Sequence, residues 1–190
     1  MAAHQTFAAA LAAYRPGSPE EAADLERAHV LLAGPDPWSR SVPLHVTGSA
    51  LVVHPPTSRV LLRWHQRQQA WLQVGGHADP GEVDPFVTAV REGGEETGLA
   101  DLRPWPGPEP TLVHLVTVPV PAGKGEPAHE HLDVRYVLAT DTPDAVEPEN
   151  PTARLRWLPV TEAMTFVAEE NLRVMLRRVA DLLVDVRGSA

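Results

Sequence analysis

Residues 84–98 carry the start and the stop of a helix, and strand-like segments lie on both sides of it. Asp84 followed by Pro85 is a helix-start signal, because an aspartate caps the first free amides and a proline suits the first turn. Gly98 after Thr97 is a stop signal, since glycine readily adopts the left-handed conformation that ends many helices. The sequence therefore predicts a helix from about Pro85 to Thr97. A helix enclosed by strands restricts the chain to folds that combine a β-sheet with helices.

The segments around this helix predict a sheet. Alternating or β-branched apolar runs predict strands at 44–55, 59–65, 111–121, 132–141 and 153–160. A Pro-Pro-Thr-Ser turn separates the first two runs, so we expect these two strands to pair. Proline and glycine in residues 120–131 predict a mobile loop.

Two further helices are predicted near the ends of the chain. Ser18 is an N-cap, Pro19 occupies the first turn and Glu21 suits a capping box, so a helix should run on to Leu32 and end at Gly34. Residues 168–186 predict a C-terminal helix with an apolar stripe at helical spacing. We expect that stripe to pack in the core; it consists of Leu172, Met175, Leu176, Val179 and Leu183.

Composition limits the classes of function. The 190 residues, 43% hydrophobic and 22% charged, suit one globular domain. A net charge of −9 argues against non-specific nucleic-acid binding, which needs a basic surface. The chain has no cysteine, which excludes disulfides and thiolate metal sites. No apolar run approaches the ~18 residues of a membrane span, and the N-terminus lacks the positive start of a secretory signal. We expect no membrane association and a cytoplasmic location.

Three glutamates lie in the second half of the predicted central helix. Glu92, Glu95 and Glu96 fall together at spacings of three and four, and Arg91 lies one turn from Glu95. The adjoining side should face the sheet and carries Phe86, Val90, Gly93 and Thr97.

A solvated helix face is the ordinary interpretation of such a charge run. Here, however, like charges one turn apart repel, and carboxylates in the last turns oppose the helix dipole, which favours cations there by ~0.3–1 kcal/mol. A bound divalent cation reverses both effects, because carboxylate oxygens are the ligands that Mg²⁺ prefers. The cluster therefore favours a metal site.

The glycines before the helix support this interpretation. Residues 79–81, Asp-Pro-Gly, suit a tight turn. Gly75 and Gly76 leave backbone groups uncovered near the expected position of the acids, so a carbonyl could complete the oxygen shell of a metal. Gly93 lies in the apolar face, where a missing side chain allows close packing on the sheet.

Together these residues resemble the signature box of the Nudix hydrolase family. The matching positions are Gly76, Glu82, Arg91, Glu92, Glu95, Glu96, Gly98 and Leu99. There are two departures: eight residues instead of seven separate Glu82 from Arg91, and Gly93 replaces an apolar residue. We expect the extra residue to lie in the turn at 79–84, with the helix from Pro85 keeping its register and Glu82 lying farther from the metal than its counterparts.

The resemblance implies an α+β fold, a Nudix-type α/β/α sandwich around a mixed sheet in residues 41–190. Residues 1–40 would add an N-terminal helical extension, and a C-terminal helix would complete the single globular unit. It also implies Mg²⁺-dependent hydrolysis (Mn²⁺ could replace Mg²⁺) of the diphosphate bond in a nucleoside diphosphate linked to another moiety. The substrate would be a small molecule, and a homodimer stays open.

The resemblance also implies residue roles. Glu92, Glu95 and Glu96, with the backbone of Gly76, would hold the metal. Glu92, Glu95 and Arg91 would form the catalytic group, with Arg91 orienting Glu95. Whether Glu95 binds metal or accepts the proton of the attacking water stays open. Substrate contacts are expected from His77, Glu82, Arg63 and His131.

Other polar and aromatic residues allow two interpretations. His129, Glu130, His131 and Asp133 would supply a base or a substrate contact at the rim, or merely form a polar loop before a strand. Arg67 and Lys124 are candidate phosphate contacts, although exposed basic side chains are usually only solvated. Trp64 and Trp71 would stack on a nucleobase, but tryptophans near strands more often pack in the core.

Two other function classes are compatible with such a fold. A non-catalytic binding or regulatory module usually loses the glutamates, and this chain keeps them. A diphosphate isomerase of this fold usually needs a catalytic cysteine, and this chain has none. The hydrolase is therefore the favoured prediction, while the identity of the substrate stays open.

Overall fold

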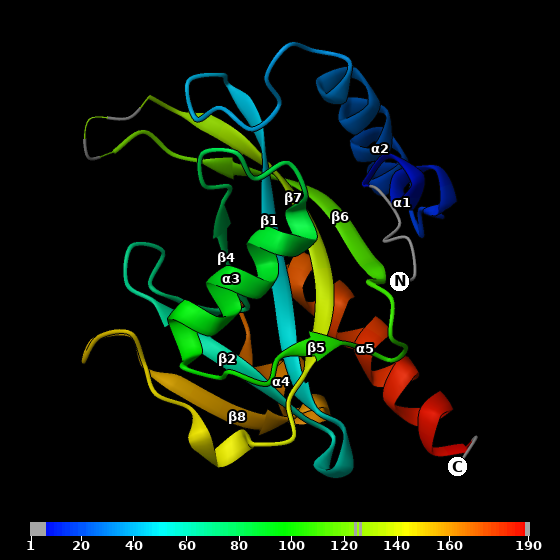
Figure 1. Cartoon of the computed structure of the whole chain (residues 1–190), viewed down its shortest axis with the longest axis vertical. Helices are drawn as coiled ribbons and strands as arrows, with labels where there is room; N and C mark the ends of the chain where they lie inside the picture. The colour runs from blue at the N-terminus through cyan, green and yellow to red at the C-terminus, as the bar shows by residue number, and fades with distance from the viewer. Residues whose placement is uncertain (1–6, 124, 126, 189–190) are drawn as a thin grey trace.

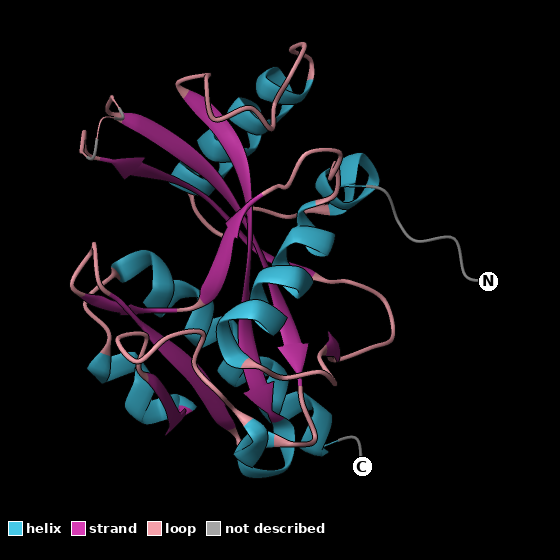
Figure 2. Cartoon of the chain, turned by 60° about the vertical axis from the view of Figure 1, so that its left-hand side comes forward, coloured by secondary structure: helices cyan, strands magenta, loops and turns pink. Residues whose placement is uncertain are grey.

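The computed structural model describes residues 7–123, 125 and 127–188, and within them one mixed sheet has helices on both faces (Figures 1 and 2). The strands are β1 (Leu44–His54), β2 (Arg59–His65), β3 (Ala70–Leu72), β4 (Val74–His77), β5 (Arg103–Pro104), β6 (Leu112–Val120), β7 (His129–Ala139) and β8 (Leu155–Pro159). The helices are α1 (Phe7–Ala13), α2 (Pro19–Leu32), α3 (Pro85–Thr97), α4 (Val160–Phe166) and α5 (Glu170–Gly188), with short 3-10 turns at Pro55–Thr57 and Pro143–Ala145. In this part of the chain, none of the helices is both long and apolar enough to cross a membrane.

Two long strands form the centre of the sheet. β1 and β7 run parallel, and β6 adds to the far edge of β7 in the antiparallel sense. The other edge of β1 has two partners in succession: β4 pairs with residues 47–50, and β2 pairs with residues 52–54. In Figure 1, β4 lies above β2 along β1. The sheet therefore divides at the middle of β1, and the candidate site lies at this division.

Alternation along β1 separates two hydrophobic layers. Leu51 and Val53 point into the layer that α4 and α5 cover, whereas Ala50 and Val52 point into the layer that α3 covers. The predicted stripe of α5 is fully or nearly fully buried in the first layer, which confirms that prediction. Both faces of the sheet are thus covered, as an α/β/α sandwich requires.

Helix α3 begins and ends where its sequence signals predict. The Asp84 side chain accepts a hydrogen bond from the Phe86 amide at 2.9 Å, and Pro85 occupies the first turn. Gly98 has φ +71°, and its amide donates to the Gly94 carbonyl. The helix runs unbroken, so the register from Pro85 onward is kept as predicted.

The buried face of α3 is rotated relative to the prediction. Phe86 and Val90 are only half-buried, while Thr88 and Ala89 are completely buried. Gly93 does face the sheet, and a side chain added there would meet Val74, Leu102 and Leu138. The small residues Thr88 and Ala89, and not Phe86 and Val90, lie where α3 comes closest to β1, because α3 packs almost directly on the backbone of that strand.

The N-terminal helices pack beside β6 (Figure 1). Ser18 caps α2 by accepting from the Glu21 amide, as predicted. Glu21 does not complete a capping box with Ser18. Its carboxylate instead accepts from the Gly17 amide and from the side chains of Tyr14 and Arg178. Glu21 therefore connects the N-terminal helices to α5.

One strand prediction needs correction. β7 begins at His129, so the polar segment predicted as a loop forms the first part of a strand. Pairing with β6 and β1 extends β7 in this direction. The structure also has three short strands outside the five runs predicted above, namely β3, β4 and β5.

Candidate active site

An open cavity of about 200 Å³ lies where β4 and β2 separate along β1. Alternate side chains of β1 and β7, which point to the same face of the sheet, form its floor. The start of α5 closes one side. Its lining includes Thr47, Ser49, Arg63, Gln73, Gly75, Gly76, His77, Glu96, His131, Asp133, Arg135 and Asn171. Four residues predicted to contact metal or substrate, Arg63, Gly76, His77 and His131, thus meet there with Glu96.

The three helix glutamates differ in exposure. The side chain of Glu96 is 10% exposed and that of Glu92 is 18% exposed, but that of Glu95 is 58% exposed. Glu96 accepts from the Gly75 amide at 3.2 Å and lies 3.3 Å from the Arg63 Nε atom. Glu96 therefore reaches through the division of the sheet, whereas Glu95 stays at the surface.

Burial makes the Glu96 and Glu92 carboxylates costly to ionise. Burial raises the pKa of Glu96 to about 7, with Arg63 acting in the opposite direction. Burial also raises the pKa of Glu92, and the neighbouring Arg91 partly offsets this effect. The neighbouring charge of Glu92 further raises the pKa of Glu96, and that of Glu95 further raises the pKa of Glu92. A cation between such carboxylates would remove the penalty on both.

Gly76 makes room for the Glu92 carboxylate. A side-chain carbon added to Gly76 would collide with all three atoms of that carboxylate. Gly75 has φ +149° and directs its amide toward Glu96. The glycine pair therefore holds the buried Glu96 and the half-buried Glu92 carboxylates against bare backbone, as the sequence predicted for the acids.

Arg91 organises the entrance side of the helix. Its guanidinium donates to Glu82 at 2.9 Å and to both Glu92 and Glu95 at 3.1 Å, and it also donates to the His77 carbonyl at 2.8 Å. These hydrogen bonds from Arg91 hold the pKa of Glu82 at about 2. Arg91 contacts Glu95 as expected, but it binds the other two glutamates as well.

Glu82 has both carboxylate oxygens occupied. Besides Arg91, it accepts from the Thr88 hydroxyl at 2.9 Å and the Asp79 amide at 3.0 Å. Glu82 is not part of the cavity lining. The carboxylate therefore connects the 79–84 turn to α3.

Asp133 lies in the floor of the cavity, not in a loop. The carboxylate is buried and accepts from Ser49 at 2.6 Å, Thr47 at 3.1 Å and Arg135 at 2.7 Å. Burial alone would raise the pKa of Asp133, but Arg135 and the two hydroxyls hold it below its ordinary value. Asp133 is thus an ionised carboxylate inside the cavity, on the strand predicted at 132–141.

Several other predicted contacts lie elsewhere. Glu130 points to the opposite side of β7 from His131 and pairs with Arg27 of α2 at 2.5 Å. Trp64 and Trp71 pair across β2 and β3 with ring centroids 5.6 Å apart. Their neighbours along the strands line the cavity, so both rings face away from it, which argues against base stacking. Trp71 packs against the core, whereas Trp64 is half-buried beside Arg154.

Arg67, one of the two remaining basic candidates, does not contribute to the cavity. Arg67 donates to the Pro121 carbonyl at 3.4 Å and is not a lining residue. Lys124 lies outside the described residues.

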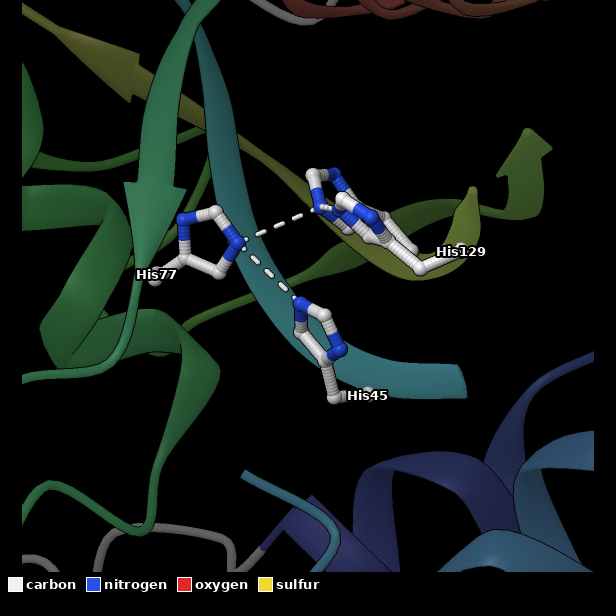
Figure 3. A group of neighbouring side chains, drawn as sticks. His45, His77 and His129 are labelled. Carbon is white, nitrogen blue, oxygen red and sulfur yellow. Dashed lines mark hydrogen bonds between the residues drawn. The ribbon is translucent and has the colours of Figure 1, made fainter. Parts of the chain in front are cut away.

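Sequence reasoning missed His45. His45 lies opposite His131 in the parallel pairing of β1 and β7, with its ring nitrogen 3.1 Å from that of His77. Figure 3 shows the two rings facing each other from β1 and β4. The alternation of His129 and His131 was a local signal for one face of a strand, but the contribution of His45 depends on long-range pairing.

Comparison with known proteins agrees with this architecture. The NUDIX domain family model matches residues 43–179. The 8-oxo-(d)GTP phosphatase of Mycolicibacterium smegmatis is 31% identical over 134 residues, which are 70% of this chain and 37% of that protein. A probable DHNTP pyrophosphohydrolase of Lactococcus lactis is 32% identical over 108 residues, 57% of this chain and 61% of that protein. The chain therefore spans less than two thirds of either curated relative.

The fold is shared with a solved structure as well. The binary complex of the C. elegans Ap4A hydrolase superimposes with a TM-score of 0.56 at 19% identity, covering 76% of this chain and 99% of that one. The matched family region extends from β1 into α5 and includes the whole divided sheet, the glycine pair and helix α3. The chain belongs to the Nudix family.

Proposed function

We propose that this protein hydrolyses the diphosphate bond of a nucleoside diphosphate linked to another moiety, with Mg²⁺ as cofactor and Mn²⁺ as an alternative. The observation that carries the proposal is the pair of carboxylates held against Gly75 and Gly76: buried Glu96, which lines an open cavity, and half-buried Glu92, which lies against Gly76 of the cavity wall. The proposal assigns catalysis to residues 41–190, treats residues 1–40 as an extension, and expects a cytoplasmic enzyme.

The residues present fit a hard divalent cation. Glu92 and Glu96 supply oxygen donors, and the missing side chain of Gly76 leaves its backbone open beside them. These three residues would hold the ion, with Glu95 as a further ligand or as the proton acceptor. When bound, Mg²⁺ supplies positive charge that neutralises phosphate oxygens and promotes ionisation of the attacking water.

The surrounding side chains position the reactants. Arg63 is held between Glu96 and Glu149, where its guanidinium can contact a phosphate oxygen. The Gln73 Oε1 atom is buried without a hydrogen-bond partner in the described part of the chain. An unpaired buried polar atom is costly, so its place in the cavity wall supports binding of a polar ligand. Arg91 is a positioning residue, because it orients Glu92 and Glu95.

The substrate class is supported by the curated relatives. The names of both describe proteins that act on nucleoside or pterin triphosphates. With a net charge of −9, this chain needs a cation or local arginines to bind a diphosphate. We propose a small nucleotide-derived substrate whose diphosphate lies between Arg63 and the Glu92–Glu96 pair.

The test is hydrolysis of a substrate panel by the full chain. Nucleoside triphosphates, sugar nucleotides, dinucleoside polyphosphates and coenzyme diphosphates would be incubated with and without Mg²⁺, and the products would be identified by mass. We expect two phosphorylated products from at least one class, and only with a divalent cation.

A matched pair of variants controls this test. Glu96→Gln should lower turnover by about 10²-fold or more, whereas Glu162→Gln, the same change at an exposed position of α4, should have no effect. Folded wild-type protein that binds nucleotides with Mg²⁺ but yields no product from the panel would instead indicate a non-catalytic module.

A further inference from the structure

Four histidines gather next to the candidate active site and outside the glutamate cluster. His45 of β1, His77 of β4, and His129 and His131 of β7 place one ring nitrogen each within 4.8 Å of one another. His45 is buried and the other three are half-buried. Three strands that pair side by side bring these residues together from distant parts of the sequence (Figure 3).

Hydrogen bonds to backbone carbonyls orient two of the rings. The Nδ1 atom of His45 lies 3.1 Å from the Val42 carbonyl, and that of His129 lies 2.9 Å from the Pro127 carbonyl. A carbonyl oxygen only accepts, so each Nδ1 carries the hydrogen and the Nε2 atom of each neutral ring is an acceptor. A backbone carbonyl on the second ring nitrogen is the usual support of a histidine that binds a metal.

The contacts between the rings cannot all be hydrogen bonds. Nε2 atoms meet at 3.1 Å between His45 and His77, at 3.2 Å between His77 and His131, and at 3.1 Å between His131 and His129. Because the Nε2 atoms of His45 and His129 are acceptors, the Nε2 atom of His77 would have to donate to His45, and that of His131 would have to donate to His129. Their own contact would then join two N–H groups. In every assignment of neutral rings, at least one of the three contacts is repulsive.

A metal ion would resolve this conflict. All four lone pairs could then point to one centre, and no hydrogen would be needed between the rings. A tetrahedral ion with metal–nitrogen bonds of 2.0–2.1 Å places its ligand nitrogens about 3.3 Å apart, close to the three contacts observed at 3.1–3.2 Å.

We propose that His45, His77, His129 and His131 form a binding site for a divalent transition-metal ion such as Zn²⁺, separate from the glutamate site. Imidazole nitrogens suit zinc, copper, nickel and iron, whereas carboxylate and carbonyl oxygens suit Mg²⁺. The two donor sets therefore select different ions. His77 and His131 also line the cavity, so an ion there would fix one wall of the active site.

The experiment is a titration of the chelator-treated full chain with Zn²⁺ alone as the probe, in buffer that keeps excess Mg²⁺ on the glutamates. We expect one equivalent of tightly bound Zn²⁺. His129→Asn and His131→Gln should each weaken the affinity at least tenfold, and His29→Asn, an exposed histidine of α2, should leave it unchanged. His129 lies at the rim, so its variant should fold; circular dichroism checks this.

Co²⁺ provides a second readout that does not depend on stability. Bound at a four-nitrogen site, it should show the visible absorption of a tetrahedral ion, and this absorption should be lost in His129→Asn. A Glu92→Gln, Glu96→Gln double variant should retain both Zn²⁺ binding and the Co²⁺ absorption. Absence of stoichiometric Zn²⁺ uptake, uptake unaffected by both histidine variants, or uptake lost only in the glutamate variant would each overturn the proposal.

Discussion

Two glutamates of adjacent sequence position, Glu95 and Glu96, have very different environments. Glu96 is enclosed between Gly75 and Arg63, whereas Glu95 lies at the surface beside Arg91. The helical spacing alone groups them with Glu92, because all three fall on one side of α3. Their environments differ because the sheet divides between β4 and β2, and only the Glu96 side chain points into this division. Exposure could not be predicted because it depends on strand pairing.

The first prediction at the residue scale concerns pH and stability without metal. The pKa of Glu96 is about 7 in the folded protein and roughly 4.3 when the chain is unfolded. Between these values the folded state holds the extra proton, so the free energy of unfolding should fall as pH rises from about 4.5 to 7. In chelator at pH 8, Glu96→Gln should be more stable than the wild type, by on the order of a few kcal/mol at most.

Denaturant unfolding in chelator at several pH values measures this difference. Glu92 also has a raised pKa, so part of the decline should persist in the Glu96 variant. Addition of Mg²⁺ should stabilise the wild type above pH 7 but not Glu96→Gln. Equal stability of the two proteins at pH 8 in chelator would contradict the prediction.

The second prediction at this scale compares Glu82 with Glu96. Both oxygens of Glu82 are used by Arg91, Thr88 and the Asp79 amide, and the residue does not line the cavity. Glu82→Gln should therefore reduce kcat less than the ~10²-fold or more expected for loss of a metal ligand. Steady-state kinetics at saturating Mg²⁺ decide this. A Glu82 variant as inactive as the Glu96 one would place Glu82 in the reaction itself.

At the scale of elements, the close contact between α3 and β1 positions the site. Gly48 of β1 lies under the first turn of α3, and an added side-chain carbon would collide with the Pro85 carbonyl. Gly94 is different, because the nearest atom to an added carbon is the Leu99 carbonyl oxygen at 3.7 Å, an ordinary contact. Only one of the two glycines is required for packing.

These two glycines make a matched prediction. Gly48→Ala should destabilise the fold and displace α3, with loss of activity, because backbone on both sides cannot move far. Gly94→Ala should stabilise the protein by roughly 0.5–1 kcal/mol, the usual difference in helix propensity. Thermal and denaturant unfolding measure both. A stabilising effect of Gly48→Ala would show that α3 can lift from β1 without cost.

Helix boundaries were more predictable than the sheet. Asp84, Pro85 and Gly98 act on their immediate neighbours, so local signals were enough to locate α3. The start of β7 was placed too late, because His129 and Glu130 are polar and join the strand through long-range pairing, both with β6 and Glu130 also with β1. The glycines at 75–76 were correctly expected to lie near the acids, but their strand pairing with β1 has no local signal.

At the scale of the whole molecule, the N-terminal helices are part of the packed structure. Leu11 and Tyr14 are buried in the same hydrophobic layer as α3 and β1. The sequence predicted α2 from its caps but contained no local sign of where α1 and α2 would dock. Docking depends on Glu21, a buried carboxylate that meets Arg178 of α5 and His114 of β6. Such a contact joins residues far apart in sequence and appears only in the assembled fold.

The final prediction tests how the N-terminal helices are held to the rest of the fold, by removing the single hydroxyl oxygen of Tyr14. The Tyr14 hydroxyl donates to Glu21 at 2.9 Å and accepts from Arg178 at 3.0 Å and from the buried Leu115 amide at 3.1 Å. Tyr14→Phe leaves that amide without an acceptor and should cost about 1–3 kcal/mol. Tyr136→Phe is the matched control, because its hydroxyl has no hydrogen-bond partner among the residues the structure describes. Denaturant unfolding of both variants compares the costs, and equal losses would show that the Tyr14 network does not secure the N-terminal helices.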